Sequence, residues 1–452
     1  MNELPNYFLA DLPPEATLSP ALLMEACQTL KRNREQYLAS RTTEDIVRLL
    51  SRVADNWLDA EYPFRKLALD VGPEKTGFSR AVIQRGLDGF FAQLTRENLR
   101  AFLIQELGDA QRLDQFAGLS GETRAALATG PEFLVHIAAG NIPNPTWHSL
   151  VLGLLTRSAQ FVKCATGASY LPRLFAHSLY DADHKLGACL EIAEWRGGNA
   201  ALEEVLFAEA DCVTVTGSDE ALAAIRARLP ASARFIGYGH RVSFGFVAAD
   251  VLFGRSAKKV VAGAADDVVA WNQLGCLSPH VFYVQRGGEI APEQFAHALA
   301  EELARRETAE PRGEIAKESA AAIASRRAVY EVRAAHSPDT LLWQSKDSTA
   351  WTVVFENDAR FALSCLNRFV YVKAVADLTE ALQGADAVRG QVSTVGLACG
   401  ERAPELATQL ARWGATRVCP IGQMQNPPLA WRHDGRPSLG DLVTWTDFER
   451  SQ

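Results

Sequence analysis

Helical spacing dominates the first part of the chain. From Ser19 to about Leu107, apolar residues recur at steps of three and four among charged ones, as at Ile46, Leu49 and Val53. Such spacing places the apolar side chains on one face of each helix. We therefore predict a helical N-terminal region over residues 1–130.

Beyond Glu132 short apolar runs alternate with helical stretches. This alternation is typical of βαβ units with a mainly parallel sheet. It predicts a first α/β domain over residues 131–254, with helices from about Asn144 and over Asp219–Leu229. Its expected strands are Phe133–Ala139, Gln160–Ala165, Cys212–Thr216, Arg234–Gly237 and Ser243–Ala248.

A second alternating series follows a long helical stretch from Arg255 to about Asn272, and predicts a second α/β domain over 255–425. Expected strands are His280–Gln285, Leu341–Gln344, Trp351–Glu356, Phe369–Val372, Ser393–Ala398 and Thr416–Ile421. Expected helices are Pro292–Glu307, Glu314–Ala335, Asp377–Leu382 and Ala403–Trp413. The rest, 426–452, is expected to serve in oligomerisation or to pack back on the first domain. The predicted class is α/β, with two α/β domains and a helical N-terminal extension.

Composition and charge argue against several classes of function and location. A net charge of −8 and a pI near 5.7 provide no electrostatic footprint for nucleic acid or anionic membranes. The N-terminus has no basic segment followed by an apolar run, so we expect no secretory signal. The most apolar stretch is broken by Arg157, so we expect no membrane span. Eight cysteines without CxxC spacing indicate reduced thiols in a cytoplasmic protein and no metal site.

Three segments are candidates for chemistry. In His136–Pro145 a strand runs into a Gly-Asn turn, a junction where open parallel sheets bind ligands, although a plain βα turn explains it as well. In Val213–Glu220 a strand ends in Thr-Gly-Ser before a helix, whose free amides suit a phosphate or ordinary capping. In Trp271–His280 one cysteine lies at a helix-to-strand junction, where a thiol can be reactive. A lone cysteine is more often a small core residue.

Taken together and in this order, the segments resemble the aldehyde dehydrogenase superfamily, and within it the long-chain acyl-CoA reductase family of bacterial bioluminescence. The specific parts are GNIPNP (140–145), NQLGCLSP (272–279) and RVCPIGQMQNPPLAWRHDGRPSL (417–439). The resemblance extends from about Pro131 to Trp445 and is loose before that. It implies an aldehyde dehydrogenase-like fold and an NADPH-dependent reduction of fatty acyl-CoA to aldehyde and CoA.

The resemblance also assigns residues to roles. Cys276 takes the place of the catalytic nucleophile, and Asn141 that of the side-chain donor to the oxyanion. Lys163, 22 residues after Asn141, takes the place of the lysine that binds the adenosine ribose of the cofactor. The segment Thr216-Gly217-Ser218 resembles the superfamily's pyrophosphate-binding turn.

Two departures from the superfamily pattern bear on the reaction. Thr166 stands where NAD-preferring members carry a ribose-binding glutamate, which leaves room for the 2′-phosphate of NADPH. The stretch Ile236–Arg241 has no carboxylate where the oxidising enzymes carry a general base for water. This loss favours reduction of a thioester over oxidation of an aldehyde. On that stretch His240 is the nearest titratable candidate for a proton donor, although an ordinary exposed or core histidine explains it as well.

Other assignments remain open. The stretch His433-Asp434-Gly435-Arg436 is typical of the family, but it is interpreted as a plain Asp-Gly turn without a catalytic role. The acyl donor could instead be a carrier-protein thioester or an acyl phosphate, with the same cysteine chemistry. A non-catalytic scaffold of a multienzyme assembly would not need Asn141, Lys163, Gly217 and Cys276 all retained. The resemblance further implies a homo-oligomer, and it is compatible with a complex with an acyl-activating or acyl-transferring enzyme.

Overall fold

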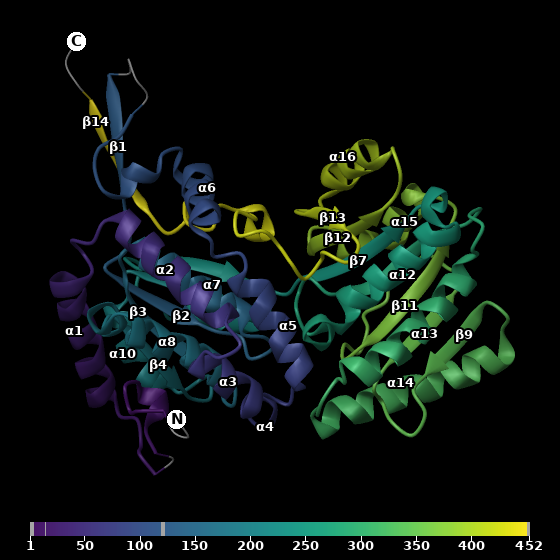
Figure 1. Ribbon diagram of the computed structural model, residues 1–452, viewed down its shortest axis with the longest axis horizontal. Helices are drawn as coiled ribbons and strands as arrows, with labels where there is room; N and C mark the ends of the chain where they lie inside the picture. Colours follow the sequence, from purple (N-terminus) through teal and green to yellow (C-terminus); the bar gives the residue numbers. More distant parts are fainter. Residues whose placement is uncertain (1–3, 14, 119–122, 450–452) are drawn as a thin grey trace.

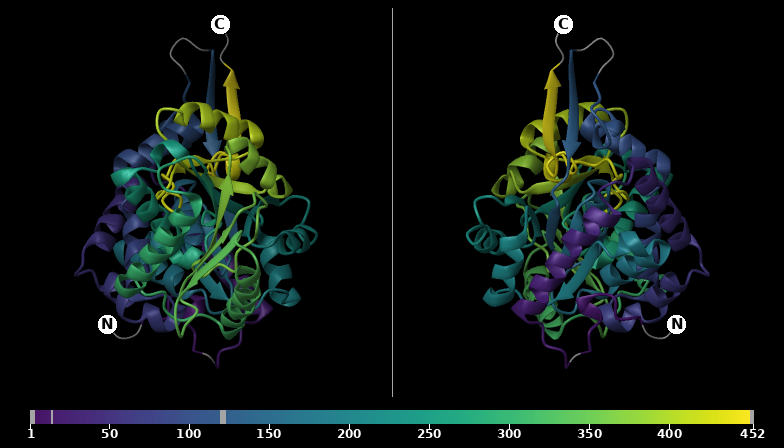
Figure 2. Two further views of the ribbon diagram at one scale, coloured as in Figure 1. Left: turned by 90° about the vertical axis from the view of Figure 1, so that its right-hand side faces the viewer. Right: turned by 90° about the vertical axis from the view of Figure 1, so that its left-hand side faces the viewer.

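Two α/β lobes, each built on its own sheet, form the body of the molecule (Figure 1). This computed structural model describes residues 4–13, 15–118 and 123–449. The N-terminal helices cover the first lobe, and a two-stranded antiparallel ribbon of β1 and β14 extends away from the body in every view (Figures 1 and 2). The predicted α/β class with a helical N-terminal region is confirmed.

Several N-terminal helices begin at a serine or threonine cap. Ser19, Thr42, Ser79 and Thr95 each accept a hydrogen bond from the amide three residues further on, which satisfies a free donor of the first turn. The helices of this region are α1 (Pro20–Tyr37), α2 (Thr43–Leu58), α3 (Pro63–Asp70), α4 (Gly72–Thr76), α5 (Arg80–Phe91) and α6 (Arg96–Leu107).

A five-stranded, wholly parallel sheet forms the first lobe, in the order β4-β3-β2-β5-β6. Its strands are β2 (Phe133–Ile137), β3 (Ala159–Cys164), β4 (Leu190–Glu194), β5 (Cys212–Thr216) and β6 (Arg234–Tyr238). The connecting helices are α7 (Asn144–Leu155), α8 (Tyr170–Ala182), α9 (His184–Gly187), α10 (Ala200–Glu209) and α11 (Asp219–Arg226). The sequence pattern missed β4, because two glutamates within five residues mask its apolar positions.

The second lobe is built on a seven-stranded sheet in the order β13-β12-β7-β8-β11-β10-β9, parallel except for β9. Its strands are β7 (Val242–Val247), β8 (Pro279–Gln285), β9 (Thr340–Gln344), β10 (Thr352–Glu356), β11 (Phe369–Val375), β12 (Val392–Ala398) and β13 (Val418–Pro420). Its helices are α12 (Gly254–Val269), α13 (Pro292–Ala309), α14 (Lys317–His336), α15 (Leu378–Gly384) and α16 (Ala403–Trp413).

The position of β7 corrects the expected domain boundary. We expected Ser243–Ala248 in the first α/β domain, but β7 pairs with β8 and β12 of the second sheet. Only three residues separate β6 from β7, so the local pattern contains no sign that the chain passes between lobes there. The second lobe therefore begins at Val242 and not near residue 255.

The end of the chain returns to the first lobe. Strand β14 (Thr444–Glu449) pairs antiparallel with β1 (Arg124–Thr129), which lies within the region predicted to be helical. The guanidinium of Arg234 donates to the carbonyl oxygens of Asp441 and Val443, at 3.0 Å each. The C-terminal segment thus lies across the first lobe before its last strand, β14, pairs with β1.

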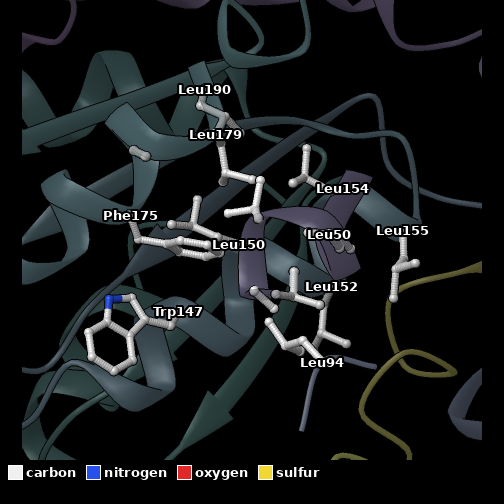
Figure 3. Close-up of a cluster of buried hydrophobic side chains, with 14 of the residues drawn as sticks. Leu50, Leu94, Trp147, Leu150, Leu152, Leu154, Leu155, Phe175, Leu179 and Leu190 are labelled. Carbon is white, nitrogen blue, oxygen red and sulfur yellow. The ribbon is translucent and has the colours of Figure 1, made fainter. Parts of the chain in front are cut away.

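Helix α7 lies at the centre of the first lobe's core. Its residues Trp147 and Leu150 are fully buried and are packed near Phe175 of α8 and Leu50 of α2 (Figure 3). A helix that is apolar on most sides must be covered on most sides. The N-terminal helices provide this cover, which explains why they accompany the first sheet.

Trp271 connects the N-terminal helices, α7 and the second lobe. Its ring makes edge contacts with Phe78 and with Trp147, at centroid distances of 5.1 and 6.2 Å. On α5, a Cβ added to Gly86 would lie 1.9 Å from this ring. Glycine at this position therefore allows α5 to approach the tryptophan.

We predict that Gly86→Ala destabilises the protein by about 1–3 kcal/mol, the usual cost of overpacking a core. Gly89→Ala, three residues further along α5, is the matched control. Its added Cβ would meet only the end of the Asn426 side chain, at 3.0 Å, and alanine favours the helix by about 1 kcal/mol. Urea unfolding of both variants measures the difference, and equal stabilities would contradict the assigned contact.

Candidate active site

The loop that carries Cys276 follows a left-handed turn. Trp271, Asn272 and Gln273 have φ angles of 46°, 53° and 65°. Residues other than glycine rarely adopt this left-handed backbone conformation. The side-chain amide of Gln273 donates to the carbonyl oxygens of Pro279 and Phe369, both at 2.8 Å. That of Asn272 donates to the carbonyl oxygen of Arg312 at 2.8 Å. These buried bonds fix the turn and therefore the start of the cysteine loop.

The main chain of Cys276 is also tied to the second sheet. The hydroxyl of Ser243 on β7 donates to the Cys276 carbonyl oxygen at 2.8 Å, and accepts from the Thr394 amide on β12 at 3.1 Å. The cysteine is therefore held from both sides of its loop.

Cys276 lines a cleft between the two lobes, of about 1550 Å³ when its solvent-open part is included. The cleft is lined by α5, α7, the ends of β5 and β6, and the C-terminal segment. Much of its wall is apolar, which suits a hydrocarbon chain. The main apolar residues are Val82, Phe90, Leu94, Leu152, Trp271, Leu277, Pro427, Leu429 and Leu442.

The environment of Cys276 keeps its thiol protonated. Burial raises the pKa of Cys276 to about 12; the negative charge of Asp434 also raises it, whereas Arg241 lowers it. A thiol with a pKa that far above neutrality retains its proton at pH 7. Because the thiolate is the nucleophile, attack on a substrate needs a group that accepts this proton.

Lys163 and Thr166 lie together at the carboxyl end of β3, as expected. Lys163 is buried, its ammonium is 5.8 Å from the Trp195 ring centroid, and burial lowers its pKa. Thr166 is exposed on the following turn. The sequence did not reveal that Glu194 of β4 reaches this turn, where it accepts from the Gly167 amide at 2.7 Å.

The Thr216-Gly217-Ser218 segment adjoins the same cleft. Thr216 lines it together with Cys276. The Gly217 amide donates to the Tyr238 carbonyl oxygen at 3.1 Å, and the Ser218 hydroxyl caps α11 by accepting from the Ala221 amide. The structure thus brings the predicted nucleophile and part of the predicted cofactor segment to one cleft.

The two asparagines of GNIPNP lie in different places. Asn141 is exposed and lines a neighbouring recess with Gly140 and Gly167. Asn144, the first residue of α7, lines the cleft of Cys276. Its side-chain oxygen is buried and has no hydrogen-bond partner within the described part of the chain. That oxygen can only accept, so a donor role belongs to the side-chain nitrogen. Because Asn144 lines the cleft of Cys276, this nitrogen is a second candidate oxyanion donor, and the motif itself contained the signal.

Two histidines differ from their expected importance. His240 is exposed, its amide donates to Asp219 at 2.9 Å, and it is not among the described residues that line the cleft. His433, which directly precedes the Asp434-Gly435 turn, does line it. The sequence analysis assigned His433 no catalytic role, because nothing local shows that this turn reaches a cysteine more than 150 positions earlier.

Comparison with known proteins identifies the family. The profile described as "Acyl-CoA reductase (LuxC)" matches residues 38–445. The chain belongs to this acyl-CoA reductase family. The long-chain acyl-protein thioester reductase of Aliivibrio fischeri is 24% identical over 415 residues, covering 90% of this chain and 82% of that protein. Long-chain acyl-protein thioester reductase 2 of Photobacterium leiognathi is 23% identical over 437 residues, covering 94% and 86%.

Solved structures show the family's fold. A salicylaldehyde dehydrogenase from Pseudomonas putida G7 superposes with a TM-score of 0.70 at 14% identity, over 97% of this chain and 92% of that one. The Δ-pyrroline-5-carboxylate dehydrogenase of Mycobacterium tuberculosis gives 0.69 at 14%, over 96% and 83%. The predicted family and aldehyde dehydrogenase-like fold are confirmed.

The described residues form neither a membrane-spanning helix nor a cluster of metal ligands. None of the helices in 4–13, 15–118 and 123–449 is both long and apolar enough to cross a membrane. The same residues contain no group of three or more histidine, cysteine, aspartate or glutamate side chains that could hold a metal ion.

The two asparagines yield a prediction. We expect Asn144→Ala to lower the turnover of an acyl thioester by about 100- to 1,000-fold, as loss of an oxyanion donor does. Asn141→Ala should lower it less, because Asn141 lies in the neighbouring recess. Steady-state kinetics of the two variants decide between them, and the opposite order would assign the role to Asn141 as the resemblance implies.

Proposed function

We propose that this protein reduces a long-chain fatty acyl-CoA to the aldehyde and CoA with NADPH, through an acyl thioester on Cys276. The observation that supports this most is the setting of Cys276. It lies in a largely apolar cleft, beside the predicted cofactor segment, at the place where the two lobes meet. An acyl chain, a nucleophile and a hydride donor can therefore meet at one point.

The carboxylates of this cleft favour reduction over oxidation. Asp266 is paired with Arg85 and Arg306, at 2.5 and 2.8 Å. The two oxygens of Asp267 accept from the amides of Gly422 and Met424. Within the described residues, both carboxylates that line the cleft are engaged in these contacts, and burial raises the pKa of Asp267 to about 7. An acid-forming enzyme would need a free base for water, whereas transfer of the acyl group to hydride does not.

The cofactor-binding residues fit a dinucleotide. Lys163 presents a buried ammonium beside an aromatic ring at the carboxyl edge of a parallel sheet, where such folds bind ligands. Gly217 adjoins the capped start of α11, whose amides suit a pyrophosphate. NADPH bound there supplies the hydride that reduces the acyl carbon.

The protein's own groups perform the remaining steps. The Cys276 thiolate attacks the thioester carbonyl, while an asparagine of GNIPNP and the Cys276 amide stabilise the oxyanion. Coenzyme A leaves as a thiolate, a good leaving group. After reduction, collapse of the hemithioacetal releases the aldehyde and restores Cys276.

An acylated protein is the second candidate donor. The two relatives described above are named as acyl-protein thioester reductases. Cys276 would attack an acyl-protein thioester in the same way as acyl-CoA, because both donors are thioesters.

A cytoplasmic location is part of the proposal.

A homo-oligomer is also part of the proposal. Every residue of β14 is exposed, and the ribbon of β1 and β14 stands apart from the body (Figure 2). Trp445 is among its exposed apolar side chains. A strand in such a protruding two-stranded sheet is suited to pairing with a second chain.

The central prediction concerns Cys276. Incubation with palmitoyl-CoA in the absence of NADPH should leave a hydroxylamine-labile acyl group on Cys276, which NADPH then releases as aldehyde. Mass spectrometry of the labelled peptide detects it. Cys276→Ala should lose both adduct and aldehyde, whereas Cys365→Ala, at a half-buried thiol elsewhere, is the control. Acylation of another cysteine, or aldehyde from the Cys276 variant, would refute the proposal.

The cofactor preference is tested at the turn after β3. We expect a higher kcat/KM with NADPH than with NADH, and a shift towards NADH in Thr166→Glu, since a carboxylate repels a 2′-phosphate. Glu194→Gln should shift the preference the other way, because it removes the carboxylate that already lies at this turn. Equal efficiency of the unaltered enzyme with both cofactors would exclude the assignment.

A further inference from the structure

The cysteine needs a proton acceptor that the sequence did not identify. Cys276 retains its proton at neutral pH, and the carboxylates lining its cleft are engaged in ion pairs or amide bonds. Uncharged imidazole is the other common base near neutrality. Three histidines of the described residues line the cleft: His136, His148 and His433.

His433 and Cys276 are attached to consecutive residues of one strand. Cys276 is held through its carbonyl oxygen by Ser243, which bonds the Thr394 amide of β12. Ser393, the preceding residue on β12, donates its hydroxyl to Asp434 at 3.2 Å. Because His433 directly precedes Asp434, β12 connects its turn with the loop of Cys276. Asp434 is close enough to raise the pKa of Cys276, and both Cys276 and His433 line the cleft.

The imidazole ring of His433 is held in a fixed orientation. It stacks on Tyr238 at 4.3 Å between centroids with 10° between the planes, and it also contacts the Trp431 ring at 4.7 Å. Tyr238 ends β6 and lines the same cleft. The stacked pair therefore lies where the first sheet borders the cleft.

His433 has charged neighbours of both signs, Asp434 on one side and Arg241 and Arg436 on the other. On its own turn, Asp434 lies 4.0 Å from its Nε2, and Arg436 is close enough to lower its pKa. From the loop after β6, Arg241 lowers it too and is paired with Asp434 at 3.3 Å; from α7, His148 faces it. Tyr238 is the neighbour from β6. Burial lowers the pKa of His433 most, so the ring is uncharged at pH 7 and can accept a proton.

The other two histidines are less suitable. The His136 ring nitrogens are both occupied, by the Thr214 hydroxyl at 2.6 Å and the Gln160 side chain at 3.0 Å. Burial lowers the pKa of both His148 and His433, so the pKa does not separate them and the position in the fold does. His148 lies on α7, whereas His433 shares with Cys276 the anchor on β12.

We propose that His433 is the proton acceptor and donor for Cys276. As the sulfur–carbon bond to the acyl group forms, the thiol proton passes from Sγ to a ring nitrogen of His433. The acyl–sulfur bond of the donor then breaks, its electron pair stays on the leaving thiolate, and the imidazolium returns the proton to that sulfur. Atoms and charge balance before the hydride step. The acyl half of this inference rests on the proposed function, but activation of the thiol does not.

Alkylation of Cys276 by iodoacetamide, followed by mass spectrometry from pH 5 to 10, tests the proton transfer without any acyl substrate or cofactor. We expect His433→Gln to lower the alkylation rate at pH 7 by about 100-fold, the usual contribution of a positioned base, and to move the rise in rate to higher pH. His184→Gln, at an exposed histidine of α9, is the matched control and should leave the profile unchanged.

Chemical rescue separates a base from a structural residue. Added imidazole should restore alkylation in His433→Ala, whose vacated space admits it, and should not alter the unmodified protein. Urea unfolding verifies that both variants are folded; if His433→Gln is not, the rescued alanine variant decides the question.

An unchanged profile in His433→Gln, absence of rescue, or an equal loss in His148→Gln or His240→Gln would overturn the inference. Histidine-dependent alkylation without acyl transfer from palmitoyl-CoA would support it while refuting the proposed function.

Discussion

The left-handed turn Trp271–Gln273 is the constraint on which the site depends. Three successive non-glycine residues in this conformation cost on the order of 1–2 kcal/mol each. Buried side-chain amides of Asn272 and Gln273 offset that cost, since each satisfies carbonyl oxygens that would otherwise lie unpaired in the core. A second left-handed turn, Leu366–Arg368, adjoins the first, and its fully buried Arg368 pairs with Glu307 at 2.7 Å. The strain is local, but its compensation extends across the second lobe.

Because of this turn, the nucleophile and the wall of its cleft are parts of one rigid unit. The same three residues that direct the chain towards Cys276 direct the Trp271 ring towards α5 and α7. An acyl chain lying along these helices would therefore be aligned with the sulfur by the backbone itself.

Local pattern predicted what depends on neighbours in sequence. Helix α16 has the predicted bounds, α7 begins at the predicted Asn144, and the β3 junction brings Lys163 to a sheet edge as expected. The features that the local pattern did not predict depend on pairing between segments that are far apart in sequence. Strand β7 has the same apolar run whichever sheet it joins, and the partner of β1 lies about 320 positions later. The cleft position of His433 is of this second kind, whereas Cys276 was found because its own flanking residues resemble a family motif.

The return of the C-terminal segment to the first lobe has a consequence for biosynthesis. Residues Gln425–Leu442 complete the cleft. The Glu106 carboxylate accepts a hydrogen bond from the Leu439 amide, which lies 333 positions later in the chain. A nascent chain therefore exposes Cys276 and the cleft-facing residues of α5 and α7 until residues 425–442 have left the ribosome. Such unfinished surfaces are prone to aggregation. Termination between β13 and residue 425 would leave every strand of the five- and seven-stranded sheets in place, with Cys276 in a cleft that lacks its C-terminal wall and His433.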